Sequence, residues 1–286
     1  MTVKVVTDSG CDIPPEIVRE LDITVIPLYV RFGDRVYRDW VDIDADTLYE
    51  RLVSDPVHPS TSQPPVGDFI ETYKKVAQET NEIVSVHITS KLSGTYSSAL
   101  AGAQQAMQAL GKQLHIEVVD SLSASMGMGL LAILAARLAR AGESLERIAA
   151  KVRQAVPNTK LFAFLDTMKY VERGGRLGKA AALLGTMLNV KPLLALKDGE
   201  AVPVGLARTR AKALERLREI AERVSHIREL AIVHSGSLTE AQSLLERLSS
   251  VVAKGQTYLS KIGPALGCHA GPGAVAVIFR EGGEEE

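Results

Sequence analysis

The sequence predicts an α/β protein, on the evidence of its periodicity and its length. Short β-branched runs, such as residues 3–6 and 83–88, alternate with longer stretches of helical periodicity. Such alternation is typical of βα units and therefore of a parallel sheet covered by helices. The chain has 286 residues, which corresponds to about two domains. We place the boundary at Pro157-Asn158, which predicts an N-terminal domain over 1–157 and a C-terminal domain over 158–286.

The first half is expected to alternate strands and helices around one interruption. Pro14 and Pro15 suit the first turn of a helix, and Asp44 is placed to cap another. Four prolines between residues 55 and 65 remove backbone donors, so this stretch is expected to be a rigid polar loop. The expected strands are 3–6, 23–32, 36–38, 83–88 and 115–119, and the expected helices are 14–20, 45–53, 66–79, 96–110, 126–141 and 145–156.

The second half changes character and contains a hairpin. Asp198-Gly199 permits the positive φ angles of a tight turn, so strands are expected on either side of it. Ser237 with Glu240 has the spacing of a capping box. The expected strands are 161–165, 193–196, 201–206, 230–233, 256–262 and 274–279, and helices are expected over 209–224 and after Ser237.

The composition excludes several classes of protein. The 33 Lys and Arg residues balance 34 Asp and Glu residues, and this net charge of −1 lacks the basic excess of a nucleic-acid binder. Two cysteines, Cys11 and Cys268, exclude a disulfide scaffold, so a cytoplasmic location is expected. The N-terminus turns polar too early for a signal peptide, and no apolar run reaches the ~20 residues of a membrane span. Six scattered histidines have no ligand spacing, so no metal site is predicted.

Small polar residues recur where the expected strands end. Asp8-Ser9-Gly10, Ser93-Gly94, Asp120-Ser121 and Ser235-Gly236 each follow a strand. The carboxyl ends of strands form the ligand crevice of open α/β sheets, and free N–H groups at helix starts suit an anion. Helix capping is the alternative interpretation for each serine.

Three loops could contribute to the same site. The stretch from Ser60 to Gln63 offers three hydroxyls and an amide between prolines, with an ordinary turn as the alternative. His269-Ala270-Gly271-Pro272-Gly273 is read as a second rigid loop that carries an imidazole. Arg173-Gly174-Gly175-Arg176 sets two guanidiniums beside flexible backbone, which suits a carboxylate or phosphate, although a solvated helix end would look the same.

Two apolar segments are the remaining candidates. Residues 126–136 and 180–188 are rich in Ala, Gly, Leu and Met, which leave room between helices and adapt in shape. Core packing and a slot for a long acyl chain both fit this composition. No Walker A motif, no zinc-binding H-E-x-x-H and no nucleophile elbow occurs.

The motifs, taken in order, resemble those of the DegV family of fatty-acid-binding proteins, which includes the acyl-binding subunits of bacterial fatty acid kinase. The resemblance spans nearly the whole chain. It rests on these segments: Thr7-Asp8-Ser9, Pro27-Leu28, Thr61-Ser62-Gln63-Pro64, Leu92-Ser93-Gly94-Thr95-Tyr96, Asp120-Ser121, Gly174-Gly175-Arg176, Arg208-Thr209 and His269-Ala270-Gly271-Pro272-Gly273-Ala274.

The resemblance implies two α/β domains with a long-chain fatty acid buried between them and no cofactor. The hydroxyls of Thr61 and Ser93 would hold the carboxylate. Three further groups would lie close by: Ser62, the N–H of Gly94, and His269.

A role in phospholipid metabolism is also implied. Arg176 and Arg208 match family positions tied to acyl-phosphate formation by a partner kinase. Family members often carry lysines after the arginine of the Arg208 motif, whereas here Arg210 and Ala211 come before Lys212. Cys268 has no assigned role.

Two functions from different classes follow. The first is a non-catalytic carrier that presents a fatty acid to an ATP-dependent kinase subunit. The second is a serine-dependent acyl hydrolase or thioesterase, with Ser93 as nucleophile and His269 as base. Free fatty acid in the purified protein would favour the carrier, and a covalent acyl adduct on Ser93 would favour the enzyme.

Overall fold

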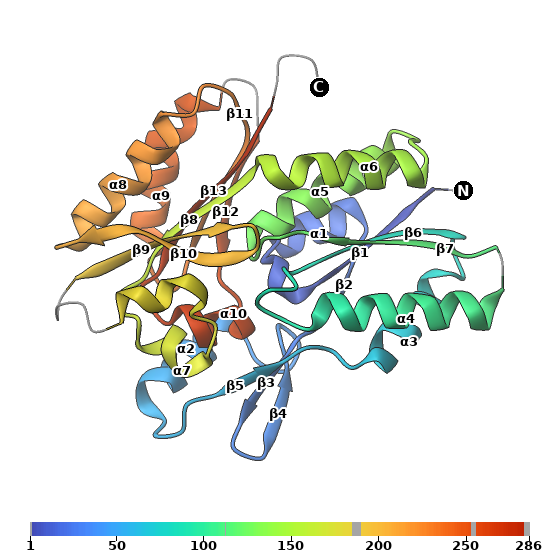
Figure 1. The fold of residues 1–286 in the computed structure, drawn as a ribbon, viewed down its shortest axis with the longest axis horizontal. Coiled ribbons are helices and arrows are strands. Elements are labelled where there is room, and N and C mark those ends of the chain that lie inside the picture. Colours follow the sequence, from blue (N-terminus) through green and yellow to red (C-terminus); the bar gives the residue numbers. More distant parts are fainter. Residues whose placement is uncertain (1, 112, 185–189, 253–255, 283–286) are drawn as a thin grey trace.

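A parallel sheet forms one half of the fold (Figure 1). The structure is a computed structural model that describes residues 2–111, 113–184, 190–252 and 256–282. The order β2-β1-β6-β7 runs through four parallel strands, β1 (Lys4–Asp8), β2 (Ile23–Ile26), β6 (Glu82–His87) and β7 (His115–Asp120). Helices α1 (Pro15–Leu21), α5 (Met126–Arg140) and α6 (Leu145–Ala155) lie on one side of it, and α3 (Val66–Val76) and α4 (Thr95–Leu110) on the other.

A mixed sheet forms the other half. Its order is β10-β9-β8-β13-β11-β12, and only the pair β11 and β12 is parallel within the described strands. The strands are β8 (Thr159–Phe164), β9 (Lys191–Lys197), β10 (Glu200–Ala207), β11 (Ile227–His234), β12 (Gln256–Lys261) and β13 (Val275–Glu281). Helices α8 (Arg210–Glu222) and α9 (Leu238–Leu248) cover its outer face (Figure 1).

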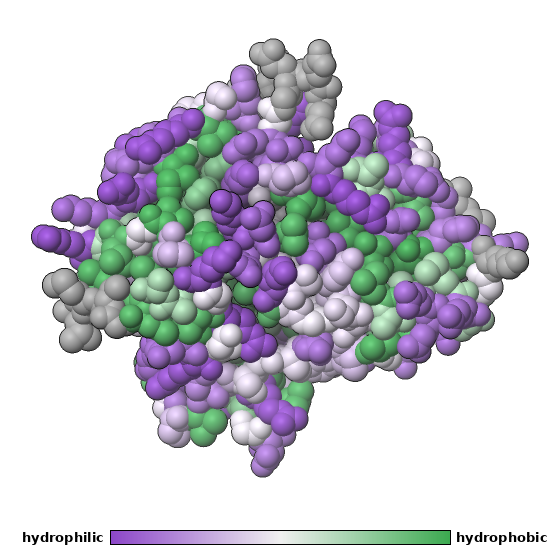
Figure 2. Space-filling model, viewed as in Figure 1, coloured by the Kyte–Doolittle hydropathy of each residue, from purple (hydrophilic) through white to green (hydrophobic). Residues whose placement is uncertain are grey.

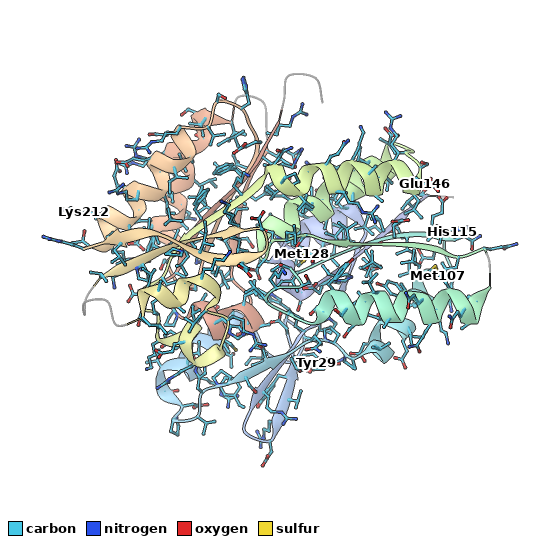
Figure 3. The ribbon with its side chains drawn as sticks, viewed as in Figure 1. Tyr29, Met107, His115, Met128, Glu146 and Lys212 are labelled. Atoms are coloured by element: carbon cyan, nitrogen blue, oxygen red, sulfur yellow. The ribbon has the colours of Figure 1, made fainter. Side chains whose placement is uncertain are left out.

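Helix α5 lies between the two sheets. It contacts β1 and β6 on one side and β8 and β13 on the other. Met128, labelled near the centre of Figure 3, is fully buried, and so are Leu130 and Leu131. The first apolar segment of the sequence is therefore the shared core of both halves, whereas residues 185–189 of the second lie outside the described residues.

A third, small sheet lies below these layers in Figure 1 and bears directly on the site. Its order is β4-β3-β5, formed by β3 (Tyr29–Phe32), β4 (Arg35–Arg38) and β5 (Ser60–Ser62). Three helices surround it, namely α2 (Ala45–Ser54), α7 (Lys169–Gly174) and α10 (Pro264–Ala270), and α10 contacts both of the others. Short 3-10 helices occur at η1 (Ser9–Cys11), η2 (Val156–Asn158), η3 (Gly178–Leu183) and η4 (Ser249–Val251).

Most expected elements are confirmed, including the parallel sheet. The Asp44 side chain caps α2 by accepting the N–H of Thr47 at 2.8 Å. The hairpin turns at Asp198 and Gly199, with φ angles of 52° and 82°. The two larger sheets draw their strands from opposite sides of η2, and the division into domains at residue 157 stays a prediction.

Two expectations about strands were wrong. The strand expected over 23–32 is two strands in different sheets, because the N–H of Leu28 bonds the Ser9 side chain instead of a neighbouring strand. The proline-rich loop contains β5, because Thr61 finds a pairing partner in Val30 of β3.

Two expectations about helix ends were also wrong. Ser237 and Glu240 form no capping box, because Arg210 binds both side chains. His269 lies in the last turn of α10 and not in a loop. Among the described helices, none is long and apolar enough to cross a membrane.

Candidate functional site

Four separate elements converge on a cavity of about 80 Å³. They are β5, the segment before α4, the last turn of α10 and the segment after α7. The polar lining residues are Thr61, Ser62, Gln63, Ser93, Arg176 and His269, and the apolar ones are Leu28, Ile88, Leu92, Ala265 and Leu266. The structure thus brings together five of the predicted site residues, namely Thr61, Ser62, Ser93, Arg176 and His269.

Hydroxyl groups enter the cavity from two sides. Thr61 is held on β5 by its pairing with Val30 of β3. Ser93 precedes α4, where its hydroxyl bonds that of Thr95 at 2.8 Å. Gly94 is the N-cap of α4, and a Cβ there would lie 2.8 Å from the side-chain nitrogen of Gln63. Glycine therefore lets the 60–63 strand approach the start of this helix.

The imidazole of His269 lies against the Thr61 hydroxyl and is partly buried. Its Nε2 lies 2.8 Å from the Thr61 hydroxyl, while its Nδ1 is buried with no hydrogen-bond partner among the described residues. Burial, with help from the positive charge of Arg176, lowers the pKa of His269 to about 4. The imidazole is therefore neutral at pH 7, with one nitrogen as donor and the other as acceptor.

Gly174 makes room for this imidazole. A Cβ at Gly174 would lie 2.0 Å from Nδ1 of His269, so any side chain there would displace the ring. Gly174 also accepts a hydrogen bond from Arg176 at 2.6 Å through its carbonyl oxygen. Gly174 thus serves close packing of α7 on α10, Gly175 is the left-handed C-cap of α7, and Arg176 is left exposed at the cavity.

Arg208 and Arg210, two residues apart, lie in different environments. Arg208 is exposed just beyond β10, and within the described residues it makes no hydrogen bond or ion pair and does not line the cavity. Arg210 instead binds Glu240, Ser237 and the carbonyl oxygen of Gly273. Of these two arginines, Arg208 is therefore the one available to an external anion.

The geometry disfavours the hydrolase alternative. A serine nucleophile needs a base within hydrogen-bond reach, and that base needs an orienting group. Ser93 bonds Thr95, and His269 bonds Thr61, whereas the Nδ1 side of the ring faces Gly174, with no carboxylate of the described part of the chain bonded to it.

A second serine, histidine and aspartate set lies deep in the core. Nε2 of His87 is 2.7 Å from the Ser85 hydroxyl, and Nδ1 is 2.9 Å from Oδ2 of Asp8. All three side chains are fully buried, so no substrate reaches them. This set ties β1 to β6 and carries no catalysis.

Sequence reasoning missed two contributors, Gln63 and Gly174. Gln63 was grouped with the hydroxyl loop, but its position against Gly94 depends on how β5 pairs. Gly174 was read as flexible backbone beside the arginines. Consecutive glycines are a signal for close approach, but the approaching residue, His269, is 95 positions away in the chain.

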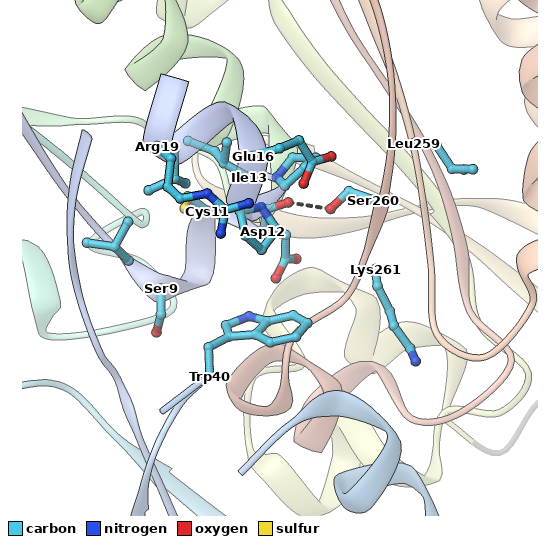
Figure 4. Close-up of a pocket in the computed structure, with 14 residues that line it drawn as sticks. Ser9, Cys11, Asp12, Ile13, Glu16, Arg19, Trp40, Leu259, Ser260 and Lys261 are labelled. Carbon is cyan, nitrogen blue, oxygen red and sulfur yellow. Dashed lines mark hydrogen bonds between the residues drawn. The ribbon is translucent and has the colours of Figure 1, made fainter. Parts of the chain in front are cut away.

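A larger cavity of about 500 Å³ is lined mainly by residues of η1 and α1 and by the end of β12 (Figure 4). Apolar groups dominate its walls, among them Ile13, Val18 and Trp40. Its buried polar side chains already have partners in the protein: Ser9 bonds Asp39, the Asp12 carboxylate bonds Ser125 and the N–H of Gly263, and Ser260 bonds the Asp12 carbonyl. This cavity therefore offers volume but little free hydrogen-bonding capacity in its floor.

Comparisons with known proteins agree with this architecture. The profile of the family described as "Uncharacterised protein, DegV family" matches residues 2–282. A DegV domain-containing protein of Lactococcus lactis, YejH, is 35% identical over 283 residues, which cover 98% of this chain and 99% of that protein.

Solved structures show the same fold. A Thermus thermophilus DegV family protein, described by its fatty acid binding, superposes with a TM-score of 0.88 at 33% identity, covering 98% of this chain and 100% of the other. DegV of Bacillus subtilis, described as a fatty acid binding protein, superposes with a TM-score of 0.86 at 31% identity, covering 99% and 100%. With its profile matched over almost its whole length, the chain belongs to the DegV family.

Proposed function

We propose that the protein binds a long-chain fatty acid with its carboxylate in the 80 Å³ cavity and its tail in the interior. The observation that carries this proposal is the convergence of Thr61, Ser93, His269 and Arg176 on one cavity with apolar walls. The fatty acid binding described for the Thermus and Bacillus proteins supports it.

The hydrogen bonds of the site suit a carboxylate. If Nε2 of His269 donates to Thr61, the Thr61 hydroxyl is free to donate to a carboxylate oxygen. Ser93 supplies a second donor, and Ser62 and the N–H of Gly94 lie on the same two segments. Since His269 is neutral, the compensating positive charge comes from Arg176 at the exposed side. Hydrogen bonds to a charged group are the strong ones, worth about 1.5 to 3 kcal/mol each.

The tail needs more room than the described cavity provides. Ligand sites for molecules of this size measure about 300 to 1,000 Å³, whereas this cavity measures about 80 Å³. Its inner walls are apolar, with Leu28, Ile88 and Leu266 among them. We therefore propose that these walls separate when the acyl chain enters.

We further propose that a kinase subunit phosphorylates the bound carboxylate. The chain has no nucleotide motif of its own, so ATP would come with the partner, which places both proteins in the cytoplasm. Figure 2 shows hydrophobic surface around β9 and β10, where Val204 and Leu206 are 45% and 43% exposed. Arg208 follows directly and is free, so this edge combines apolar surface with a cation suited to a phosphate.

Mass spectrometry of the purified protein tests the binding proposal. Native spectra, together with extraction into organic solvent, should reveal free long-chain fatty acid in about equimolar amount. An acyl group that remains on Ser93 after denaturation would support the hydrolase instead. No lipid after purification, combined with no binding of added palmitate or oleate, would refute the proposal.

Arg208→Ala separates the partner role from lipid binding. Because Arg208 does not line the cavity, the variant should retain fatty acid within about two-fold of the wild-type affinity. With a cognate kinase subunit and ATP it should lose most acyl-phosphate formation. Loss of lipid comparable to that of Ser93→Ala, or normal phosphorylation, would contradict this division of roles.

A further inference from the structure

Ser9, from the Thr7-Asp8-Ser9 motif, has no part in the proposed contacts to the fatty acid. It lies in η1 and is 2% exposed. Its hydroxyl donates to Oδ2 of Asp39 at 2.6 Å and accepts the N–H of Leu28 at 2.9 Å. Ser9 therefore joins the residue just before β3 to a carboxylate just beyond β4.

Asp39 extends this connection to α10. Its Oδ1 accepts the N–H of Ala265 at 3.0 Å, and the side chain is 1% exposed. Asp12 binds the residue just before α10, since its Oδ1 accepts the N–H of Gly263 at 2.8 Å. The first N–H groups of a helix have no partner within the helix, so these two buried carboxylates fix where α10 begins.

The segments that carry Thr61 and His269 are both connected to the Ser9–Asp39 bond. On one side, Leu28 leads into β3, and β3 holds Thr61 through the pairing of β5. On the other side, Ala265 precedes His269 by four residues, which is about one helical turn. The two arms meet where Thr61 and His269 lie 2.8 Å apart.

We infer that Ser9 and Asp39 are positioning residues that set the geometry of the carboxylate site, without touching its ligand. This inference rests on the proposed fatty-acid function. Leu28 and Ala265, the two residues that the pair binds through their backbones, are themselves walls of the 80 Å³ cavity. The Ser9–Asp39 bond therefore links the N–H groups of two wall residues, in addition to the direct bond from the Asp39 N–H to the Leu28 carbonyl oxygen at 2.8 Å.

Removal of the pair has a definite structural consequence. Without the Ser9 hydroxyl, Asp39 loses a donor and the buried N–H of Leu28 loses its acceptor. Buried groups left without partners are costly, so the two segments must move to find new ones. Hydrogen bonds weaken steeply when their geometry is distorted, and the contact between Thr61 and His269 is the one that this movement would distort.

The test compares Ser9→Ala, Asp39→Ala and Asp39→Asn with the wild type at a temperature where all are folded. Calorimetry with palmitate should give about ten-fold weaker binding for both alanine variants. Asp39→Asn keeps an acceptor for Ala265 and places a donor toward Ser9, so it should bind within about three-fold of the wild type. Glu229→Gln is the matched control, because Glu229 is an equally buried carboxylate that pairs with Arg137 and Arg280 away from the site.

An NMR readout separates positioning from general destabilisation. The imidazole signals of His269 in the ligand-free protein should shift in Ser9→Ala and Asp39→Ala but not in Glu229→Gln. Unchanged affinity and unchanged signals in both alanine variants would overturn the inference, as would equal losses in Asp39→Asn and Asp39→Ala. If wild type binds no palmitate, the proposed function fails, but the His269 signals still decide whether the pair positions that residue.

Discussion

The larger cavity beside η1 and the smaller cavity at Thr61 and His269 differ in a way that volume alone would misjudge. The larger one, about 500 Å³, has buried polar groups that are already bonded to partners within the protein. The smaller one, about 80 Å³, gathers three hydroxyls, an amide, an imidazole and a guanidinium from four elements. The smaller cavity, whose groups still have hydrogen-bonding capacity for a ligand, is therefore the one that we propose for the carboxylate.

Helix α10 lines the smaller cavity and is held at its start by a residue of the larger one. Its start is held by Asp12, which lines the larger cavity, and its last turn carries His269 into the smaller one. Burial raises the pKa of Asp12 to about 8 and that of Asp39 to about 7, whereas it lowers that of His269 to about 4. The same helix is thus anchored by acids that burial tends to neutralise and ends in a base that burial also keeps neutral.

The largest effects are expected for Thr61→Ala and Ser93→Ala. Each removes a hydrogen-bond donor to a carboxylate, worth about 1.5 to 3 kcal/mol, so affinity for palmitate should fall roughly 10- to 150-fold. Calorimetry measures the affinity, and circular dichroism checks that the variants fold. Wild-type affinity in both folded variants would remove the carboxylate from the smaller cavity.

Gly174→Ala should weaken binding about ten-fold. The new Cβ would lie 2.0 Å from Nδ1 of His269, so the ring must leave its contact with Thr61. Overpacking of this kind also costs about 1 to 3 kcal/mol of stability. Gly67→Ala in α3 is the matched control, because nothing lies within 4 Å of its Cβ position. That control should leave affinity unchanged, and equal affinity in both variants would contradict the role of Gly174.

Stability should fall as the pH rises from about 7 to 8.5. Asp12 and Asp39 have folded-state pKa values of about 8 and 7 against an ordinary 3.8, so the folded protein binds more protons than the unfolded chain over this range. Because of this proton linkage, the free energy of unfolding should fall by about 1 to 2 kcal/mol between pH 7 and 8.5. His269 affects stability in the opposite direction, because its pKa is lowered in the folded protein. Its contribution to the free energy of unfolding is lost as the pH falls from 6.5 toward 4.

Urea denaturation at several pH values measures this effect. Asp12→Asn is uncharged at every pH and keeps an acceptor for Gly263, so its stability should be flatter than that of the wild type above pH 7. A slope in this variant equal to that of the wild type would show that Asp12 does not titrate in this range.

The sequence predicts the local structure well and the long-range contacts poorly. Asp44, Asp198 and Gly199 act within a few residues, and their cap and turn are as expected. Strand β5 and the failed capping box depend on Val30 and Arg210, partners about 30 residues away in the chain. Periodicity carries no information about such partners.

The site follows the same rule. The strand-end pattern and the hydroxyl loop pointed to Ser93 and to Thr61, and the family resemblance assigned them together with His269. The helical setting of His269 was missed, because α10 is only seven residues long and lies between Gly263 and Gly271. The roles of Gly174 and Ser9 were missed because each serves a residue from a distant segment.

The smallest effects are expected from one arginine at each cavity. Arg176 and Arg19 are both exposed, and they line the smaller and the larger cavity respectively. An exposed charge contributes roughly 0.2 to 1 kcal/mol, so Arg176→Ala should weaken palmitate binding only a few-fold while impairing phosphorylation more. Arg19→Ala should leave both unchanged, because the buried polar groups Ser9, Asp12 and Ser260 of its cavity already have partners in the protein. Calorimetry and the kinase assay on the matched pair decide between the cavities, since a greater loss of palmitate affinity in Arg19→Ala than in Arg176→Ala would transfer the carboxylate to the larger one.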